Sequence, residues 1–268
     1  FRTTDGAGVK LVRVLGNLTT KEFDPILMLD SFDSINPDDY TAGFPMHPHR
    51  GIETISYVSR GKMVHRDSLG NEAGISDGEV QWMNSGSGIM HEEMVPAAER
   101  LLGVQLWLNL PAKDKMSKPS YNSIKNEDIK EIEIEGGKIR LLAGKYGEHE
   151  GYKGDYLSMD YYDIHLNADA EVTLTMEEDD SVMVFTLLGD VYIDGEHIEE
   201  KTAVKLTEGD SLTIKNGNEK AQVLYMNSRA LNEPVAWAGP IVMNTQEELQ
   251  KAFLELRSNT FIKETAEY

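Results

Sequence analysis

Cysteine is absent from the chain, and this absence excludes disulfides, zinc sites built on thiolates, iron–sulfur clusters and cysteine nucleophiles. Long hydrophobic runs are absent too. No stretch approaches the roughly 20 consecutive apolar residues that a membrane-spanning helix needs, so we expect no membrane partner. Positive charge is scarce, with 26 Lys and Arg against 46 Asp and Glu and a net charge of −20. A field of that sign repels phosphate backbones, so we expect no direct binding of nucleic acid.

The remaining composition is that of a folded protein. With 268 residues, 40% of them hydrophobic, the chain is long enough for one large domain or two ordinary ones. It begins with Phe1 rather than with Met and shows no apolar signal core, which indicates a trimmed N-terminus. From these features we expect a cytoplasmic protein.

Apolar and polar residues alternate along many short segments, which is the pattern of half-buried β strands. The clearest of these segments are 9–15, 52–58, 104–108, 157–164, 172–176 and 182–188. Turn signals rich in glycine and aspartate separate them. Many short strands at close spacing predict an all-β sandwich or barrel. One short C-terminal helix is predicted after Thr245, which forms a capping box with Glu248 ahead of an apolar stripe.

A weak internal repeat indicates two domains of similar plan. In both copies an expected strand ends at a glycine, Gly61 or Gly189, and a second expected strand follows it. Each copy later has an acidic–Gly–acidic turn, at 77–79 or at 208–210, before another strand. We therefore predict two tandem β-barrels, one over residues 1–125 and one over residues 139–268, the second ending in the helix. The charged segment 111–135 is predicted to contain the linker.

Four residues in the first half of the chain have the spacing of a metal site. His47 and His49 place two imidazoles on one face of an extended segment, and His91 and Glu93 do the same with an imidazole and a carboxylate. Two such strands inside a barrel would bring together three histidines and one carboxylate. These ligands suit divalent iron, nickel, copper, manganese or zinc. Glu53, four residues beyond His49 and predicted on the same strand face, competes with Glu93, and spacing alone leaves both open.

One His-x-His pair alone is more often an accident of a solvated or hydrogen-bonded surface than a metal site. Two pairs beside glycine-rich turns, in a chain with only seven histidines, favour a metal site. Surface positions or core packing are predicted for the four isolated histidines: His65, His149, His165 and His197. Arg50 is predicted to pair with Glu53 rather than to hold an anionic substrate.

Three segments of the N-terminal half carry a more specific pattern. They read Phe44-Pro-Met-His47-Pro-His49-Arg50-Gly51-Ile-Glu53-Thr, then His65-Arg-Asp67-Ser-Leu-Gly70-Asn, then Gln81-Trp82-Met83-Asn-Ser-Gly86-Ser-Gly88-Ile-Met-His91-Glu-Glu93-Met94. This series resembles the signature of the pirin family of bicupins, and the C-terminal stretch 239–245 with its helix is similar as well. The resemblance covers nearly the whole chain and is weaker over 126–232.

The resemblance implies two tandem cupin-type β-barrels with a metal in the N-terminal one. Carried over residue by residue, the ligands are His47, His49, His91 and Glu93, which leaves Glu53 outside the ligand set. The metal that the resemblance implies is Fe(II), with Ni, Cu, Mn, Co or Zn as other divalent ions for such ligands. The second repeat agrees, because it has no His-x-His ahead of its glycine turn. Two departures from the family pattern are predicted at the mouth of the pocket: Met46 and Ile52.

Bacterial members of the family imply a metal-dependent dioxygenase of the quercetin 2,3-dioxygenase type. Its substrate would be a flavonol or a similar planar, enolic small molecule whose hydroxyl proton Glu93 accepts as the catalytic residue. An alternative of another class is a non-enzymatic metal-binding regulator with a protein partner, as the eukaryotic members imply. The pocket distinguishes the two, because an enzyme needs an open route to the metal and a regulator does not.

Overall fold

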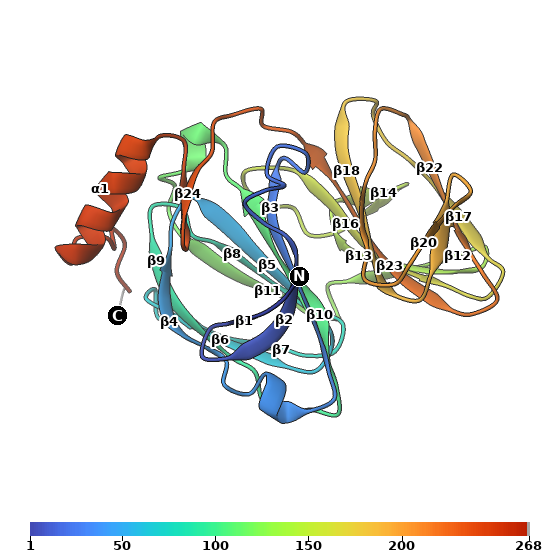
Figure 1. The fold of residues 1–268 in the computed structure, drawn as a ribbon, viewed down its shortest axis with the longest axis horizontal. Helices are drawn as coiled ribbons and strands as arrows, with labels where there is room; N and C mark the ends of the chain where they lie inside the picture. Colours follow the sequence, from blue (N-terminus) through green and yellow to red (C-terminus); the bar gives the residue numbers. More distant parts are fainter. Residues whose placement is uncertain (267–268) are drawn as a thin grey trace. The chain divides into compact units, whose positions relative to one another are not determined.

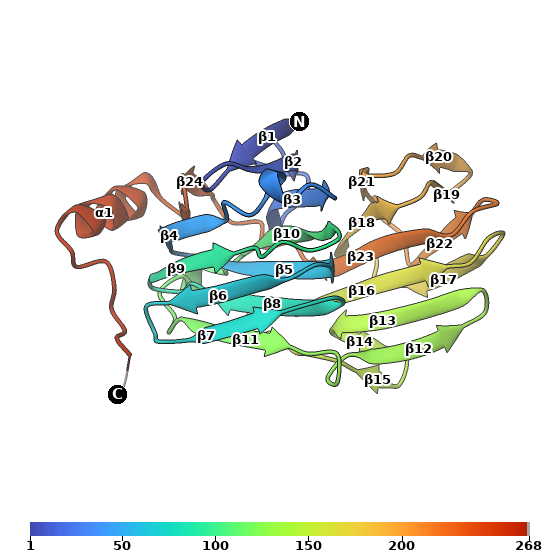
Figure 2. The ribbon, with the colours of Figure 1, turned by 90° about the horizontal axis from the view of Figure 1, so that it is seen from below.

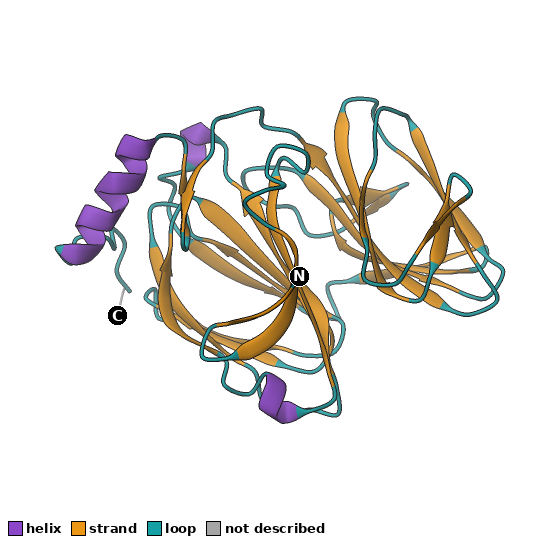
Figure 3. Cartoon of the chain, in the orientation of Figure 1, coloured by secondary structure: helices purple, strands orange, loops and turns teal. Residues whose placement is uncertain are grey.

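The computed structural model describes residues 1–266, and β strands dominate it (Figure 1 and Figure 3). The chain forms two compact units. Unit 1 comprises Phe1–Lys21, Ile26–Lys125 and the described part of Leu231–Tyr268, and unit 2 comprises Glu22–Pro25 and Asn126–Ala230. The all-β fold predicted from the alternating pattern is confirmed.

Two antiparallel sheets build most of unit 1 (Figure 2). The larger sheet has seven strands in the order β1 (Arg2–Asp5), β2 (Val9–Leu15), β3 (Ile26–Ser34), β10 (Leu101–Asn109), β5 (Ile52–Arg60), β8 (Glu79–Asn84) and β11 (Ser120–Ile124). The smaller sheet has the order β4 (Phe44–His49), β9 (Ile89–Met94), β6 (Met63–Asp67) and β7 (Glu72–Ile75). Unit 1 also contains a hairpin of β24 (Ala236–Ala238) and β25 (Ile241–Met243). Two short 3-10 helices, Pro37–Asp39 and Ala112–Asp114, and the C-terminal helix belong to it as well. Apolar side chains from both sheets, among them Phe32 and Phe44, share one core.

Unit 2 again consists of a larger and a smaller sheet. The larger has the order β12 (Lys130–Ile134), β13 (Gly137–Ala143), β16 (Met159–Leu166), β23 (Ala221–Arg229), β18 (Asp180–Leu188) and β21 (Ala203–Lys205). The smaller has the order β17 (Glu171–Thr175), β22 (Ser211–Asn216), β19 (Val191–Ile193) and β20 (Glu196–Ile198). A separate hairpin pairs β14 (Lys145–Tyr146) with β15 (His149–Glu150).

The two units share one strand order. Unit 1 contains β3-β10-β5-β8 and β4-β9-β6-β7, and unit 2 contains β16-β23-β18-β21 and β17-β22-β19-β20. The internal repeat is thereby confirmed, with Gly61 (φ +110°) and Gly189 (φ +77°) at equivalent turns after β5 and β18. The acidic turns are not equivalent. The turn at 77–79 leads into β8, whereas the turn at 208–210 leads into β22, the counterpart of β9.

The residues that β4 and β9 bury differ from those that their counterparts in unit 2 bury. The counterparts of β4 and β9 in unit 2 contribute apolar side chains to its core: Val172, Leu174, Leu212 and Ile214. Unit 1 instead buries a set of polar side chains on β4, β8, β9 and β10: His49, Gln81, His91, Glu93 and Gln105. Buried polar groups need partners, so this interior is where a functional site is expected.

The C-terminal segment belongs to unit 1. Helix α1 (Gln246–Arg257) begins after Thr245, whose hydroxyl accepts a hydrogen bond from the Glu248 backbone in the predicted capping box. It packs Leu249 and Ala252 against the hairpin of β24 and β25. This division differs from the predicted second domain, 139–268, because the chain returns to unit 1 at Leu231. The segment 111–135, predicted to contain the linker, contains β11 and β12. Within residues 1–266, no helix has both the length and the apolar character needed to cross a membrane.

Candidate metal centre

Neighbouring strands β4 and β9 bring three histidines together. His47 and His49 lie on β4, and His91 on β9 pairs with His47 in the antiparallel register. Residues two apart share a face of a strand, so both imidazoles of β4 lie on one side. One nitrogen from each ring lies within 4.8 Å of the other two, and residues 1–266 contain no second group of this kind.

The Nδ1 atoms of the two β4 histidines have defined roles. Nδ1 of His47 lies 2.7 Å from the Pro45 carbonyl oxygen, and Nδ1 of His49 lies 3.0 Å from that of Pro240. A carbonyl oxygen only accepts, so both Nδ1 atoms donate. In a neutral ring the Nε2 atom then keeps a free lone pair.

The three Nε2 atoms converge on one point. Nε2 of His47 lies 3.1 Å from that of His49 and 2.9 Å from that of His91. Lone pairs at this separation repel one another unless a cation lies between them. Metal–nitrogen bonds of about 2.0–2.1 Å at right angles would separate two nitrogens by about 2.9 Å. The donor set therefore fits a divalent metal ion.

The two buried imidazoles are held in the neutral form. Burial, followed by the proximity of His47, lowers the pKa of His49 to about 3. Burial also lowers the pKa of His91 well below its usual range, with His49 and His47 adding to the effect. Neutral imidazole is the form that binds metals, so both rings are ready to bind without losing a proton.

Glu93 lies beside the three histidines but is engaged by amides. Nε2 of Gln105 donates to both carboxylate oxygens at 3.1 Å, and Nε2 of Gln81 donates to Oε1. The side chain is buried and lines the same cavity as His47 and His49. The structure thus brings three of the four predicted ligands together, and Glu93 as the fourth stays a prediction.

Glu53 does not share a strand face with His49, so that prediction is wrong. The chain turns at Gly51, whose φ of +82° favours glycine, and Glu53 lies on β5 in the other sheet. Its carboxylate accepts a hydrogen bond from Nε1 of Trp82 at 3.1 Å. The predicted pairing of Arg50 with Glu53 is wrong as well, because Arg50 pairs with Glu255 of α1.

The sequence interpretation missed the contact that His65 makes with the site. The His65 side chain is buried, in agreement with the prediction of core packing. Its Nδ1 also lies 3.3 Å from Nδ1 of His91. Nε2 of His65 lies 2.7 Å from the carboxylate of Asp67. The His-x-Asp spacing on one strand face is the signal that could have identified the pair.

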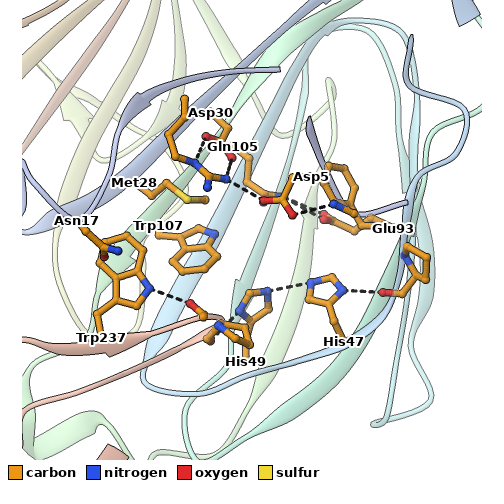
Figure 4. A pocket seen from close by; sticks show the side chains of 16 residues that line it. Asp5, Asn17, Met28, Asp30, His47, His49, Glu93, Gln105, Trp107 and Trp237 are labelled. Carbon is orange, nitrogen blue, oxygen red and sulfur yellow. Dashed lines mark hydrogen bonds and ion pairs between the residues drawn. The ribbon is translucent and has the colours of Figure 1, made fainter. Parts of the chain in front are cut away.

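A cavity of about 550 Å³ opens beside the histidines (Figure 4). Its polar lining comprises Asp5, Arg13, Asn17, Asp30, His47, His49, Glu93 and Gln105. Its apolar lining includes Met28, Phe44, Trp107 and Trp237, together with Pro45 and Pro240. Asp5 and Asn17 are exposed, so the cavity communicates with solvent. The candidate metal centre is thus reached from solvent.

The cavity wall differs from the predicted one. Met46 and Ile52 were expected at its mouth, but neither lines it. Met46 neighbours His47 on β4 and therefore points to the opposite face, where it is 50% exposed. Ile52 is fully buried in a core cluster with Trp107. Trp107 also meets the ring of His49 edge-on at 5.1 Å, so it serves both core and cavity.

An ion cluster forms the side of the cavity away from the histidines. The guanidinium of Arg13 donates from Nε and Nη2 to the two oxygens of Asp30, at 2.9 and 2.7 Å. Nη2 also donates to Asp5 at 2.8 Å. A planar guanidinium held by two carboxylates is a rigid part of the wall.

Comparison with known proteins agrees with this architecture. The pirin family matches residues 8–108, and the pirin C-terminal cupin domain matches residues 161–262. The chain belongs to the pirin family. Among its relatives, human pirin is 35% identical over 95% of this chain and 89% of its own length. A Pseudomonas aeruginosa relative, provisionally named quercetin 2,3-dioxygenase, is 39% identical over 95% of this chain and 92% of its own length.

A solved member of similar fold is the crystal structure of a quercetin 2,3-dioxygenase from Acinetobacter baumannii. It is 30% identical and has a TM-score of 0.88, covering 97% of this chain and 94% of that one. Together with the two family matches, it confirms the prediction of two cupin domains.

Proposed function

We propose that this pirin-family protein is a metal-dependent dioxygenase of the quercetin 2,3-dioxygenase type. Its substrate would be a flavonol or a similar planar, enolic compound. The observation that carries the proposal is the convergence of three histidine Nε2 atoms beside an aromatic-lined cavity that reaches solvent. The relatives in P. aeruginosa and A. baumannii that bear the name of this activity support it.

The proposed metal ligands are His47, His49, His91 and Glu93, and the proposed ion is Fe(II). Ni, Cu, Mn, Co and Zn are alternatives, since imidazole and carboxylate bind all of them. When bound, such an ion supplies a Lewis acid that makes the enol hydroxyl of the substrate more acidic. His49 and His91 bind in the neutral form that their burial enforces.

The cavity suits a flat aromatic substrate. Its volume of about 550 Å³ falls within the range of about 300–1,000 Å³ that small-molecule sites occupy. Trp107 and Trp237, with ring centroids 5.5 Å apart, supply a wall for a planar ring system. Asn17 at the exposed rim can form hydrogen bonds with the peripheral hydroxyls of such a ring.

Glu93 is proposed to accept the proton of the enol hydroxyl. Its two amide partners, Gln81 and Gln105, donate to it and so fix the direction of its carboxylate toward the cavity. The substrate oxyanion that results is electron-rich and reacts with dioxygen at the two carbons flanking the one that carries the oxygen. Both atoms of dioxygen enter the cleaved product. The carbon between the two attacked positions leaves as carbon monoxide with the oxygen that it already carries.

Dioxygen uptake by Fe(II)-reconstituted protein on quercetin tests this proposal. We expect stoichiometric uptake with carbon monoxide release, and we expect both to disappear in His91→Ala. Glu93→Gln should lower the rate by about 10²–10⁴-fold, the usual contribution of a proton-accepting side chain. No uptake by protein shown to hold iron would contradict the dioxygenase. Capture of a protein partner by the iron-loaded form would then support the alternative, a non-enzymatic metal-binding regulator.

A further inference from the structure

A fourth histidine, His65, is buried next to the three that converge. His65 lies on β6, which pairs with β9 so that Asp67 is opposite His91. Nδ1 of His65 lies 3.3 Å from Nδ1 of His91, the nitrogen that faces away from His47. The ring of His65 stacks on Tyr121 with centroids 3.9 Å apart and planes inclined by 12°, which fixes its orientation.

Asp67 determines which nitrogen of His65 carries the hydrogen. Its fully buried carboxylate lies 2.7 Å from Nε2 of His65. It also accepts hydrogen bonds from the backbone of Leu69 and from both the backbone and the side chain of Asn71. An ionised carboxylate only accepts, so Nε2 of His65 donates to it. Nδ1 of a neutral His65 is therefore left as an acceptor.

His91 must then be the donor of the pair. Its Nδ1–H points at Nδ1 of His65, and its Nε2 keeps the lone pair that faces His47 at 2.9 Å. His47 and His49 reach the same state through backbone carbonyls. Of the three converging histidines, only His91 depends on another side chain for its tautomer.

We propose that His65, held by Asp67, is a positioning residue that keeps His91 in its Nδ1–H tautomer and so directs the Nε2 lone pair at the metal. The inference rests on the metal site of the proposed function and not on the reaction. Partners of this kind commonly contribute about 10–100-fold to metal affinity. If His65 only packed against Tyr121, any flat ring would serve. That role predicts that a substitution which keeps a ring leaves metal affinity unchanged.

Two substitutions separate the roles. His65→Phe keeps an aromatic ring beside Tyr121 but removes the acceptor, whereas His65→Asn removes the ring and keeps an amide oxygen near the position of Nδ1. Affinity for Co(II), measured by competition with a chromophoric chelator, should fall about 10–100-fold in His65→Phe. His65→Asn should recover most of that loss, and its Co(II) absorption spectrum should match that of the wild type. His91→Ala gives the reference for full loss of the ligand.

Equal Co(II) affinity in the wild type and His65→Phe would overturn the inference. An equal loss of Co(II) affinity in His65→Phe and His65→Asn would overturn it as well. Thermal unfolding of the metal-free proteins shows whether the variants fold. If they do not, ¹⁵N NMR of the imidazoles in the metal-free wild type decides. Hydrogen on Nδ1 of His91 and on Nε2 of His65 supports the inference, and hydrogen on Nε2 of His91 overturns it. None of these measurements needs substrate. If His65 affects Co(II) binding as expected but the protein consumes no dioxygen, the proposed dioxygenase activity is refuted and the role of His65 is not.

Discussion

Arg50 and Glu255 form an ion pair, 2.7 Å from Nη2 to Oε2, that joins the end of the histidine-bearing strand to helix α1. Arg50 directly follows His49 and is 2% exposed. Its Nε donates to the Ser87 carbonyl at 2.7 Å, and its Nη2 donates to the Phe261 carbonyl at 3.0 Å. The guanidinium also lies 4.2 Å from the centroid of the Phe261 ring. One buried cation thus ties the C-terminal helix and the segment after it to the residue that follows the two β4 histidines.

Replacing Arg50 by Met should destabilise unit 1 by about 3 kcal/mol, because the change leaves two buried carbonyls without their donor and removes one of the two cations that pair with Glu255. The value lies at the lower end for a broken buried pair, since Lys263 also pairs with Glu255, at 3.1 Å. Urea unfolding of the metal-free protein, followed by tryptophan fluorescence, measures it. All three tryptophans belong to unit 1, so the signal reports on that unit.

The matched control for Arg50 is Arg60→Met. Arg60 lies 3.7 Å from Asp77 in an exposed pair on the same unit. Exposed pairs contribute little, so we expect a change below about 0.5 kcal/mol. An equal effect of the two substitutions would contradict the buried role of Arg50.

Gly51→Ala tests the turn that separates β4 from β5. A Cβ at this position would lie 1.9 Å from the carbonyl oxygen of Val242, and the φ of +82° is already unfavourable for alanine. We expect a loss greater than about 3 kcal/mol, the upper end for backbone strain alone. Gly8→Ala is the control, since Gly8 has a φ of +119° but no atom within 4 Å of the added Cβ. The same unfolding measurement should give a smaller loss there, and equal losses would refute the clash.

Lys115 makes the stability of unit 1 depend on pH. Its ammonium group is buried, and burial lowers the pKa to about 7. Between that value and the ordinary 10.5, the unfolded chain holds a proton that the folded chain has released. The contribution of this group to the free energy of unfolding therefore rises with pH across that window, by at most about 1.4 kcal/mol per unit.

Lys115→Met isolates this effect. Nζ of Lys115 donates to the Gly51 carbonyl at 2.8 Å and to the Asn109 side chain at 2.5 Å, so the variant also loses two hydrogen bonds at every pH. The difference in unfolding free energy between wild type and variant should move in favour of the wild type from pH 7 to pH 10. A difference that stays constant with pH would show that the amine titrates normally in the folded protein.

What the sequence predicted correctly depends on local periodicity. Alternating apolar residues predict the strands, a capping box predicts the start of α1, and the i, i+2 spacing of His47 and His49 places both on one face. What it missed depends on partners distant along the chain or on single backbone torsions. Nothing near Arg50 indicates that it pairs with Glu255, and the alternation of polar residues does not show that Gly51 turns the chain. The tautomer of His91 depends on a neighbouring strand in the same way.

Trp237 is the cavity residue whose replacement separates substrate binding from metal binding. It comes from β24, packs against Trp107 and lies outside the group of three histidines, and its Nε1 donates to the Gly239 carbonyl within its own hairpin. We expect Trp237→Ala to weaken quercetin binding about 10-fold, or about 1.4 kcal/mol, as the loss of one aromatic contact does. Trp237→Phe should retain most of the affinity, because a ring face remains, and Co(II) affinity should stay at the wild-type value in both. Anaerobic calorimetric titration of the metal-loaded proteins with quercetin measures these effects. Unchanged quercetin binding in Trp237→Ala would show that this cavity is not where the flavonol lies, even if the protein consumes dioxygen.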